Sequence, residues 1–244
     1  MRLVATHEEI GVVTGRWRRA GEGIAFVPTM GNLHAGHLEL VRAARGLADR
    51  VGASIFVNPL QFNDGADLAA YPRTPEEDRA LLHAAGVDAL FMPDAAQVYP
   101  RGMAAATRVE VPALSGILCG EFRPGHFTGV ATVVAALFNM VRPDAAVFGE
   151  KDYQQLLIIR RLVEDLRFPI RIEGVATVRE EDGLAYSSRN AYLGPPERRR
   201  AAELYRALSG VRDAIVGGRR DYSALAEAAL RRRESAGFRP EYLG

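Results

Sequence analysis

The sequence predicts an α/β fold: a Rossmann-like parallel sheet covered by helices, followed by a smaller C-terminal α+β domain. Two patterns predict this fold. Short runs of β-branched and aromatic residues alternate with longer helical patterns through the first three quarters of the chain, as in a parallel sheet built from βαβ units. Polar clusters also follow several of the predicted strands, where open α/β sheets bind their ligands.

The predicted strands are short and apolar, and helical patterns separate most of them. The strands fall at residues 24–28, 53–57, 88–92, 145–148 and 170–178. The helices fall at residues 38–47, 75–85, 127–141 and 152–166, of which the third is apolar on almost every face, as a buried helix is. Beyond residue 190, Ala-rich and Arg-rich patterns predict helices at residues 196–216 and 222–234. We therefore expect two domains, residues 1–185 and residues 186–244.

The two ends of the chain and its cysteine content give further expectations. Residues 241–244 resemble the start of another strand, so we expect the C-terminal domain to be incomplete. The N-terminus lacks the apolar core of a signal peptide, and no segment approaches the roughly 18 apolar residues of a membrane span. Cys119 is the only cysteine, which excludes an intramolecular disulfide and a zinc site built on several thiolates. We expect a cytoplasmic protein without a membrane partner.

The charge composition excludes one class of partner and singles out one residue. The chain has 31 basic and 30 acidic residues and a net charge of +1, so we expect no nucleic-acid partner. Lys151 is the only lysine among the basic residues. Arginine is a poor substitute where a site needs a compact ammonium, so Lys151 is either a functional residue or a leftover surface residue. The arginine runs at residues 198–200 and 231–233 are expected as solvated helix faces.

The first polar cluster runs from a strand into a helix start and carries the pattern H-x-G-H. His34 and His37 are three residues apart and so share a helix face. A helix N-terminus offers free N–H groups and a positive dipole end, which favour phosphate. The cluster indicates a nucleotide site, with capping or core histidines as one alternative. A metal pair is the other alternative, and it lacks a third ligand nearby.

Two more clusters follow later strands. In N-P-L-Q-F the amide of Gln61 can fix a hydroxy acid, or it belongs to a turn with a surface glutamine. In G-E-K-D-Y-Q-Q, Lys151 lies where a phosphate would bind, and Asp152 can cap the helix that follows. Gln155 is three residues beyond Asp152, so its amide can face the same cleft.

The fourth cluster, D-G-L-A-Y-S-S-R-N, places two hydroxyl groups beside Arg189. A mobile loop of this composition can close over a polyphosphate, with the guanidinium binding two oxygens. The alternative is a solvated polar loop.

Six motifs now stand in order: P-T-M-G-N-L-H-A-G-H, F-V-N-P-L-Q-F, Y-P-R-T, R-P-G-H-F, F-G-E-K-D-Y-Q-Q-L and D-G-L-A-Y-S-S-R-N-A-Y-L. Together they closely resemble the pantoate–β-alanine ligase (pantothenate synthetase) family of H-I-G-H-type nucleotidyl transferases, strongly over residues 26–193. The resemblance implies that ATP and (R)-pantoate give pantoyl adenylate and pyrophosphate. β-Alanine then attacks the adenylate to give pantothenate and AMP. The resemblance also implies Mg²⁺ and a homodimer.

The resemblance assigns roles to particular residues. Gln61 matches a residue that binds pantoate and lies beside β-alanine, and Gln155 matches one that binds pantoate. The implied catalytic residues, expected to act as cationic donors to phosphate oxygens, are His37, His34, Lys151 and Arg189. The implied ATP-binding residues are Met30, Gly31, Asn32, Leu33, His34, Ala35, Gly36, His37, Gly149, Glu150, Lys151, Asp152, Val178, Tyr186, Ser187, Ser188 and Arg189.

Several points stay open beside this resemblance. Tyr186 stands where the family usually has methionine or another aliphatic residue, so loop closure or adenine packing can differ. His126 either lines the pantoate pocket or packs near a helix start. Glu77 and Asp78 either help to hold Mg²⁺ or lie on an exposed helix face, so the metal ligands are left unassigned.

Two other functions compete with the one that the resemblance implies. A related cofactor adenylyltransferase would share H-x-G-H but would not account for N-P-L-Q-F together with E-K-D-Y-Q-Q. The intact His37, Lys151 and Arg189 argue against a catalytically weakened nucleotide-binding protein. The short C-terminus leaves this alternative open, because in the family that the sequence resembles the second domain helps to cover the active site.

Overall fold

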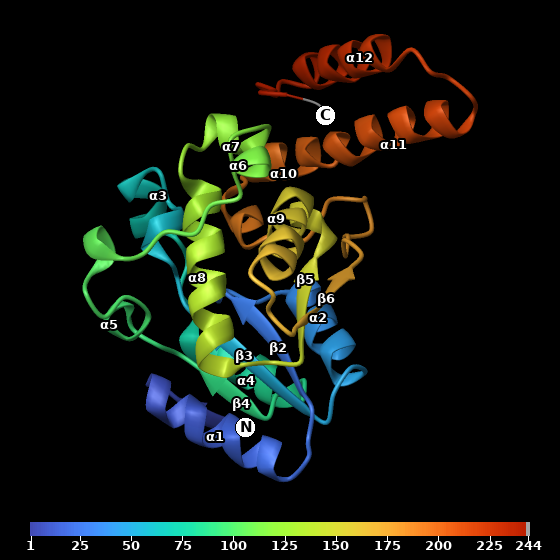
Figure 1. Cartoon of the computed structure of the whole chain (residues 1–244). Helices are drawn as coiled ribbons and strands as arrows, with labels where there is room; N and C mark the ends of the chain where they lie inside the picture. The colour runs from blue at the N-terminus through green and yellow to red at the C-terminus, as the bar shows by residue number, and fades with distance from the viewer. Residues whose placement is uncertain (243–244) are drawn as a thin grey trace. The chain divides into compact units, whose positions relative to one another are not determined.

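In a computed structural model, which describes residues 1–242, six parallel strands form one sheet in the order β1-β4-β3-β2-β5-β6 (Figure 1). The strands are β1 (Arg2–Val4), β2 (Ile24–Thr29), β3 (Arg50–Ile55), β4 (Ala89–Phe91), β5 (Ala145–Gly149) and β6 (Arg171–Val175). Each neighbouring pair runs parallel. The predicted parallel sheet is therefore confirmed.

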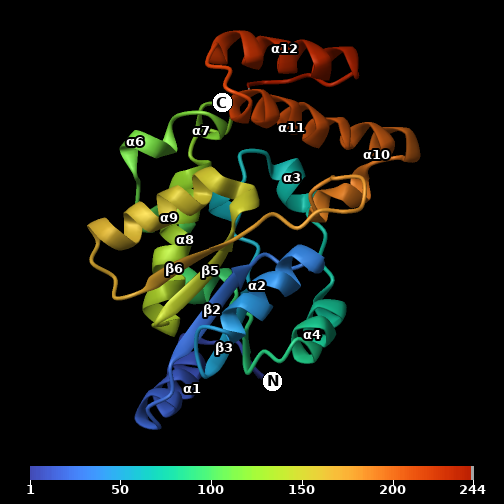
Figure 2. The ribbon, with the colours of Figure 1, turned by 90° about the vertical axis from the view of Figure 1, so that its right-hand side faces the viewer.

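Helices cover both faces of this sheet (Figure 2). One face carries α1 (His7–Arg19), α8 (His126–Val141) and α9 (Tyr153–Asp165), and the other carries α2 (Ala35–Arg45) and α4 (Pro75–Ala84). The shorter helices of this part of the chain are η1 (Pro59–Gln61), α3 (Gly65–Ala70), α5 (Ala95–Val98), η2 (Met103–Ala105), α6 (Pro112–Ser115), α7 (Cys119–Phe122) and η3 (Glu150–Asp152).

The core has one apolar layer on each side of the sheet, because side chains alternate along each strand. In β2, Phe26 packs into the layer beneath α1, α8 and α9, and Val27 packs into the layer beneath α2 and α4. Both side chains are almost completely buried. Most of α8 is buried as well, as its apolar sequence predicts.

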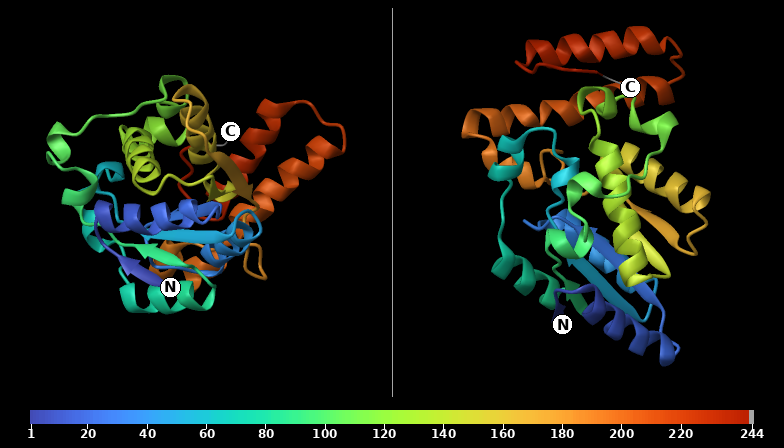
Figure 3. Two further views of the ribbon diagram at one scale, coloured as in Figure 1. Left: turned by 60° about the horizontal axis from the view of Figure 1, so that its bottom comes forward. Right: turned by 60° about the vertical axis from the view of Figure 1, so that its left-hand side comes forward.

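The first strand and first helix are not among the predicted elements. β1 has three residues, of which Val4 alone is buried, so it carries no apolar run. Four side chains of α1 are buried among many charged ones, and α1 packs alongside α8 (Figure 3). No helix within residues 1–242 is long and apolar enough to cross a membrane.

The chain divides into two compact units, residues 1–177 and the residues from 178 onward. The division comes earlier than the domain boundary predicted after residue 185. Val178 belongs to the second unit because the chain folds back there: the Tyr186 N–H donates to the Val178 carbonyl at 3.1 Å, and Arg179 forms an antiparallel bridge with Ala185.

The second unit is mainly helical over its described residues. Its helices are η4 (Ser188–Tyr192), α10 (Pro195–Ala201), α11 (Glu203–Val216) and α12 (Tyr222–Ser235). The strand expected over residues 241–244 falls partly on Leu243 and Gly244, which lie outside the described residues.

Two arginines of the second unit depart from the solvated faces predicted for their runs. Arg198 forms ion pairs with Glu180 and Asp182, each at 2.6 Å, and so holds the turn between them. Arg233 is buried and donates to the Tyr242 carbonyl at 2.7 Å. Both therefore stabilise the fold of the second unit.

Candidate functional site

The polar clusters of the first unit meet where the strand order reverses. β2 pairs with β3 on one side and with β5 on the other. The chain passes from β2 to β3 and β4 in one direction and continues with β5 and β6 in the other, so the switch point lies between β2 and β5. In open α/β sheets, ligands bind beyond the carboxyl ends of the strands at such a point. The loops after β3, β2 and β5 carry Gln61, the two histidines and Lys151.

The loop after β2 has a strained but well-anchored backbone. Gly31 and Asn32 have φ angles of 80° and 49°, in the left-handed region. A Cβ added to Gly31 would lie 2.9 Å from an Asp78 oxygen, so glycine also provides the space for that carboxylate. Asp78 accepts the backbone N–H groups of Asn32 and Leu33, each at 2.8 Å. The carboxylate of Asp78, in the first turn of α4, therefore holds this loop in place.

Two hypotheses are open for Glu77 and Asp78, a role in holding Mg²⁺ and an exposed helix face. The exposed helix face is wrong for Asp78. Its side chain is buried rather than part of an exposed helix face, and its Oδ1 atom also accepts the Thr74 hydroxyl at 3.2 Å. Both of its oxygens are occupied by protein donors, so Asp78 is not placed as a metal ligand. Glu77 is exposed. No group of three or more His, Cys, Asp and Glu side chains within residues 1–242 is arranged to hold a metal.

The two histidines face each other at the start of α2. Their ring centroids lie 4.1 Å apart, and His34 is the N-cap residue of the helix. The backbone N–H of His34 donates to His37 Nδ1 at 3.3 Å. Because Nδ1 accepts this bond, the proton of a neutral His37 ring lies on Nε2. His37 can therefore donate through Nε2 to a phosphate oxygen.

The protein groups around both imidazoles favour the neutral form, and the role of His34 and His37 as cationic donors to a bound phosphate stays a prediction. Burial lowers the pKa of His37 to about 3, with smaller contributions from His34 and Lys151. Burial and the Lys151 charge also lower the pKa of His34, against a smaller opposing effect of Asp152. Desolvation and a nearby positive charge both disfavour the imidazolium form. Lys151 is therefore the fixed positive charge among these three groups.

Lys151 lies in η3, directly after β5 ends at Gly149. Its ammonium is 3.7 Å from an Asp152 oxygen, and both side chains are partly exposed. Its positive charge lowers the pKa of both imidazoles, as expected for an ammonium near them. The structure thus brings together His34, His37 and Lys151, which stand on two loops far apart in the sequence.

Gln61 is held at its side chain and at its backbone. Asn58 Nδ2 donates to Gln61 Oε1 at 3.2 Å, and Gln61 Nε2 lies 3.0 Å from Met30 Sδ, at the start of the histidine loop. His126 Nδ1 lies 2.7 Å from the Gln61 carbonyl oxygen. Arg123 donates to His126 Nε2 at 3.3 Å, so Nδ1 carries the proton and donates to Gln61. Gln61 is therefore a buried residue and not a surface glutamine in a turn.

The two neighbouring glutamines of α9 differ in their surroundings. Gln154 donates to the carbonyls of Leu114 and Ile117 and accepts the Cys119 N–H, so it ties α9 to the segment that contains α6 and α7. Gln155 is half-buried. Its role in pantoate binding, which the family resemblance implies, stays a prediction.

The remaining predicted ATP-binding residues belong to the second unit. Ser187 caps η4 by accepting the Arg189 N–H at 3.3 Å. Asn190 donates to Glu180 Oε1 at 3.3 Å and to the Ala185 carbonyl at 3.1 Å. The serine–arginine segment thus has a defined local conformation, supported by the turn that precedes it.

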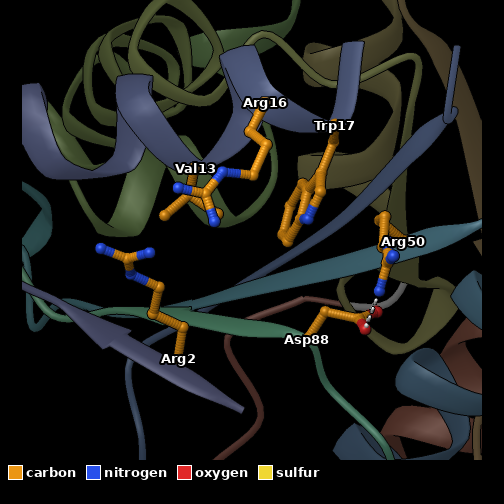
Figure 4. Close-up of a pocket in the computed structure, with 6 residues that line it drawn as sticks. All are labelled: Arg2, Val13, Arg16, Trp17, Arg50 and Asp88. Carbon is orange, nitrogen blue, oxygen red and sulfur yellow. Dashed lines mark hydrogen bonds and ion pairs between the residues drawn. The ribbon is translucent and has the colours of Figure 1, made fainter. Parts of the chain in front are cut away.

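A small pocket of about 130 Å³ lies at the other end of the sheet (Figure 4). Its lining residues are Arg2, Val13, Arg16, Trp17, Arg50 and Asp88. Arg2 begins β1 and Arg50 begins β3, so the pocket lies at the amino ends of the strands. Arg50 pairs with Glu22 at 2.7 Å and with Asp88 at 3.1 Å. This pocket is therefore separate from the histidine and lysine site.

Two residues that organise the site escape prediction from the sequence. Asp78 looks like the third acid of a charged helix start, and only its burial reveals that it anchors the histidine loop. The Tyr99 hydroxyl donates to Asn58 Oδ1 at 2.7 Å, although the two residues are 41 positions apart in the sequence. The signal for Tyr99 was weak, because a single tyrosine after a short helix has no pattern of its own.

Comparisons with known proteins agree on one family. The family model described as Pantoate-beta-alanine ligase matches residues 2–244. A pantothenate synthetase of Thioalkalivibrio sulfidiphilus is 60% identical over 243 residues, covering 100% of this chain and 85% of that protein. A pantothenate synthetase structure from Thermus thermophilus is similar with a TM-score of 0.89 and 52% identity, covering 100% of this chain and 86% of the other.

A third relative was solved with ligands. The structure of a pantoate-β-alanine ligase from Francisella tularensis, complexed with "Beta-gamma ATP" and β-alanine, is similar with a TM-score of 0.87 and 34% identity. The match covers 100% of this chain and 90% of that one.

Proposed function

The chain belongs to the pantoate–β-alanine ligase family, and we propose that the site at the ends of β2, β3 and β5 condenses (R)-pantoate with β-alanine in a reaction that consumes ATP. The products are pantothenate, AMP and pyrophosphate. One observation carries the proposal for these residues: His34 and His37 meet Lys151 across the switch point of the sheet, beside the buried amide of Gln61.

In the first step, a pantoate carboxylate oxygen attacks the α-phosphorus of ATP. A new O–P bond forms, the bond from the α-phosphorus to the bridging oxygen breaks, and pyrophosphate leaves with the electron pair. Negative charge is redistributed over the phosphate oxygens, so fixed donors there stabilise the transition state. Lys151 supplies a positive charge, and His37 supplies the Nε2–H donor that its hydrogen bond from His34 enforces.

Bound ATP also favours the protonated form of His34. A polyphosphate next to a neutral imidazole raises its pKa, because an opposite charge favours the protonated form. His34 therefore gains protonated character as ATP binds. His37, whose Nδ1 atom accepts the His34 N–H, stays a neutral donor through Nε2.

In the second step, the neutral amine of β-alanine attacks the acyl carbon of pantoyl adenylate. The C–N bond forms, the bond from the acyl carbon to the phosphate oxygen breaks, and AMP leaves. The amine nitrogen loses one proton to water or to an imidazole that is free to accept it. His37 Nδ1 is occupied as an acceptor, so this proton does not go to that atom.

We assign the remaining contacts on the same basis. Gln61 and Gln155 bind pantoate, and Gln61 also lies beside β-alanine, as the family resemblance implies. Val178 and the segment from Tyr186 to Arg189, all in the second unit, contact ATP on the same ground. Arg189 would bind phosphate oxygens bidentately.

Mg²⁺, which the family resemblance implies, has no protein cage in the described residues. No group of three or more His, Cys, Asp and Glu side chains within residues 1–242 is arranged to hold it, and both Asp78 oxygens accept protein donors. Mg²⁺ commonly keeps several waters and binds through substrate phosphates. We therefore propose that it accompanies ATP as a phosphate complex. A homodimer and a cytoplasmic location remain part of the proposal.

ATP–pyrophosphate exchange tests the proposal. Radiolabelled pyrophosphate should enter ATP only when (R)-pantoate is present, and β-alanine should then release AMP and pantothenate in equal amounts. Exchange without pantoate would contradict the assigned substrate. Exchange that depends on pantoate but yields no pantothenate would contradict the second step.

A further inference from the structure

A chain of three hydrogen-bonding side chains determines which end of the Gln61 amide faces a ligand. The Tyr99 hydroxyl lies 2.7 Å from Asn58 Oδ1, and Asn58 Nδ2 lies 3.2 Å from Gln61 Oε1. Asn58 and Tyr99 are almost completely buried, and Gln61 is only 8% exposed. These hydrogen bonds are therefore largely shielded from solvent.

Two backbone partners show which end of the Asn58 amide is the oxygen, and the Tyr99 hydroxyl helps to hold the amide in that orientation. The Leu60 N–H, which can only donate, points at Asn58 Oδ1 at 3.3 Å, so that atom is the oxygen. The Gly129 carbonyl, which can only accept, lies 3.0 Å from Nδ2, so that atom is the nitrogen. The Tyr99 hydroxyl must then donate to Asn58.

The orientation of Asn58 fixes that of Gln61. Asn58 Nδ2 donates to Gln61, so the atom that it contacts is the carbonyl oxygen of the side chain. The Gln61 NH₂ group is left at the opposite end, against the Met30 thioether, which is a weak acceptor. Gln61 thus presents donors and no acceptor toward the loop that carries the histidines.

We propose that Tyr99 is a positioning residue that sets substrate specificity: acting through Asn58, it locks Gln61 as a hydrogen-bond donor for an oxygen acceptor of pantoate. This proposal rests on the proposed function, because it concerns the substrate of the same site. Burial holds the pKa of the Tyr99 phenol above its usual range, so the hydroxyl stays protonated and keeps donating at physiological pH.

The fixed orientation of the Gln61 amide affects which substrates can bind. A pantoate hydroxyl or carboxylate oxygen can accept from the Gln61 NH₂ group. A substrate that offers only a donor at that place would leave two donors facing each other, which costs binding free energy. Tyr99 lies outside contact with any ligand in this scheme, so its removal should change pantoate binding without changing ATP binding.

Tyr99→Phe tests the proposal, with pantoate affinity measured by calorimetry and by the pantoate dependence of ATP–pyrophosphate exchange. Loss of one hydrogen bond should raise the Kd and the KM for pantoate by about tenfold and leave the KM for ATP within about twofold. Thr14→Val is the matched control, since it removes a buried hydroxyl that bonds to the Ile10 carbonyl in α1. It should leave both constants unchanged.

A double-mutant cycle separates positioning from general loss of structure. In a Gln61→Ala background, Tyr99→Phe should change the pantoate Kd by less than about twofold, because the residue that it positions is gone. A tenfold effect in both backgrounds, or none in the wild-type background, would overturn the proposal. Absence of pantoate-dependent exchange in the unmodified protein would instead overturn the proposed function.

Gln61→Glu keeps the proposal testable if Tyr99→Phe fails to fold. A glutamate oxygen can still accept from Asn58, but the outward atom becomes an acceptor. Pantoate binding should then be weaker than in Gln61→Ala, with ATP binding kept. Pantoate binding as tight as in the unmodified protein would show that Gln61 presents its oxygen, and would overturn the assigned polarity.

Discussion

The carboxylate of Asp78 accepts the backbone N–H of Asn32 at 2.8 Å, which joins α4 to the loop that carries both histidines. A second bond of the same length comes from the next residue of that loop. Asn32 has a φ of 49°, a conformation that asparagine tolerates but that needs support. The buried carboxylate provides this support from outside the site.

Asp78→Asn should therefore impair ATP use. An amide has one acceptor where the carboxylate has two, so one loop N–H is left without its bond. Hydrogen bonds to charged groups contribute about 1.5–3 kcal/mol, which corresponds to a loss of about tenfold or more in kcat/KM for ATP. Steady-state kinetics with ATP varied would measure this loss.

Asp144→Asn is the control for this prediction. Asp144 accepts the Ile24 N–H at 2.7 Å, at the opposite end of β2. The substitution should lower the thermal stability but keep the KM for ATP. An Asp78→Asn protein with normal ATP kinetics would show that the loop holds its shape without the carboxylate.

Lys151→Arg should keep most of the affinity for ATP and lower kcat sharply. A guanidinium is planar and broad, so it retains the positive charge but cannot place it at the point that a compact ammonium reaches. Equilibrium binding of ATP and single-turnover formation of pantoyl adenylate would separate the two effects. Arg171→Lys, at an exposed ion pair with Glu173, makes the reverse exchange as a control and should change neither quantity. An unchanged rate for Lys151→Arg would mean that any positive charge suffices.

His37 should make the protein less stable in acid. Its pKa is about 3 in the folded protein and near 6.5 when unfolded, so the unfolded chain binds more protons between these values. The free energy of unfolding should then fall as the pH drops below about 6.5, by up to about 1.4 kcal/mol per pH unit. Urea unfolding followed by the fluorescence of Trp17, the only tryptophan, would report it.

His37→Gln should flatten this acid dependence relative to the unmodified protein. His83→Gln, at an exposed position on α4, should leave the slope as it is. Equal slopes in the His37→Gln variant and the unmodified protein would contradict a half-buried His37 with a lowered pKa.

Gly129→Ala should disturb the Gln61 segment, because α8 packs directly against η1. A Cβ at residue 129 would lie 2.3 Å from the Leu60 carbonyl oxygen and 2.7 Å from the Gln61 nitrogen. Overpacking of this kind costs about 1–3 kcal/mol of stability, and here it should also raise the KM for pantoate. Thermal unfolding and pantoate kinetics would measure both effects.

Gly11→Ala is the control for this substitution, because it should raise the stability where Gly129→Ala should lower it. Gly11 lies within α1, and a Cβ there meets nothing within 4 Å. Alanine should stabilise that helix by up to about 1 kcal/mol and leave pantoate kinetics alone. If Gly129→Ala also raised the stability and left pantoate kinetics unchanged, α8 and η1 would not be in close contact at residue 129.

The fold and the ligand-binding loops follow from local patterns in the sequence. Apolar runs predict β2 to β6, and the polar residues after them predict where ligands bind, because parallel strands bring their carboxyl ends to one edge. β1 could not be predicted, since Val4 is its one buried residue and its pairing with β4 depends on tertiary structure.

The electrostatics and supports of the site could not be predicted in the same way. The neutral state of His37 results from burial, which a sequence pattern does not reveal. Asp78 and Glu77 are adjacent acids in one helix, and the direction of each side chain decides that one is buried and the other exposed. Tyr99 reaches Asn58 only because the chain between them folds back.

The transfer of a labelled oxygen tests most directly whether this site adenylylates pantoate. The protein would be supplied with ATP, β-alanine and pantoate carrying ¹⁸O in both carboxylate oxygens, and the products analysed by mass spectrometry. Attack of the carboxylate on the α-phosphorus leaves one ¹⁸O on the phosphate of AMP and one in the amide of pantothenate. AMP without ¹⁸O, or ¹⁸O in pyrophosphate, would contradict the account.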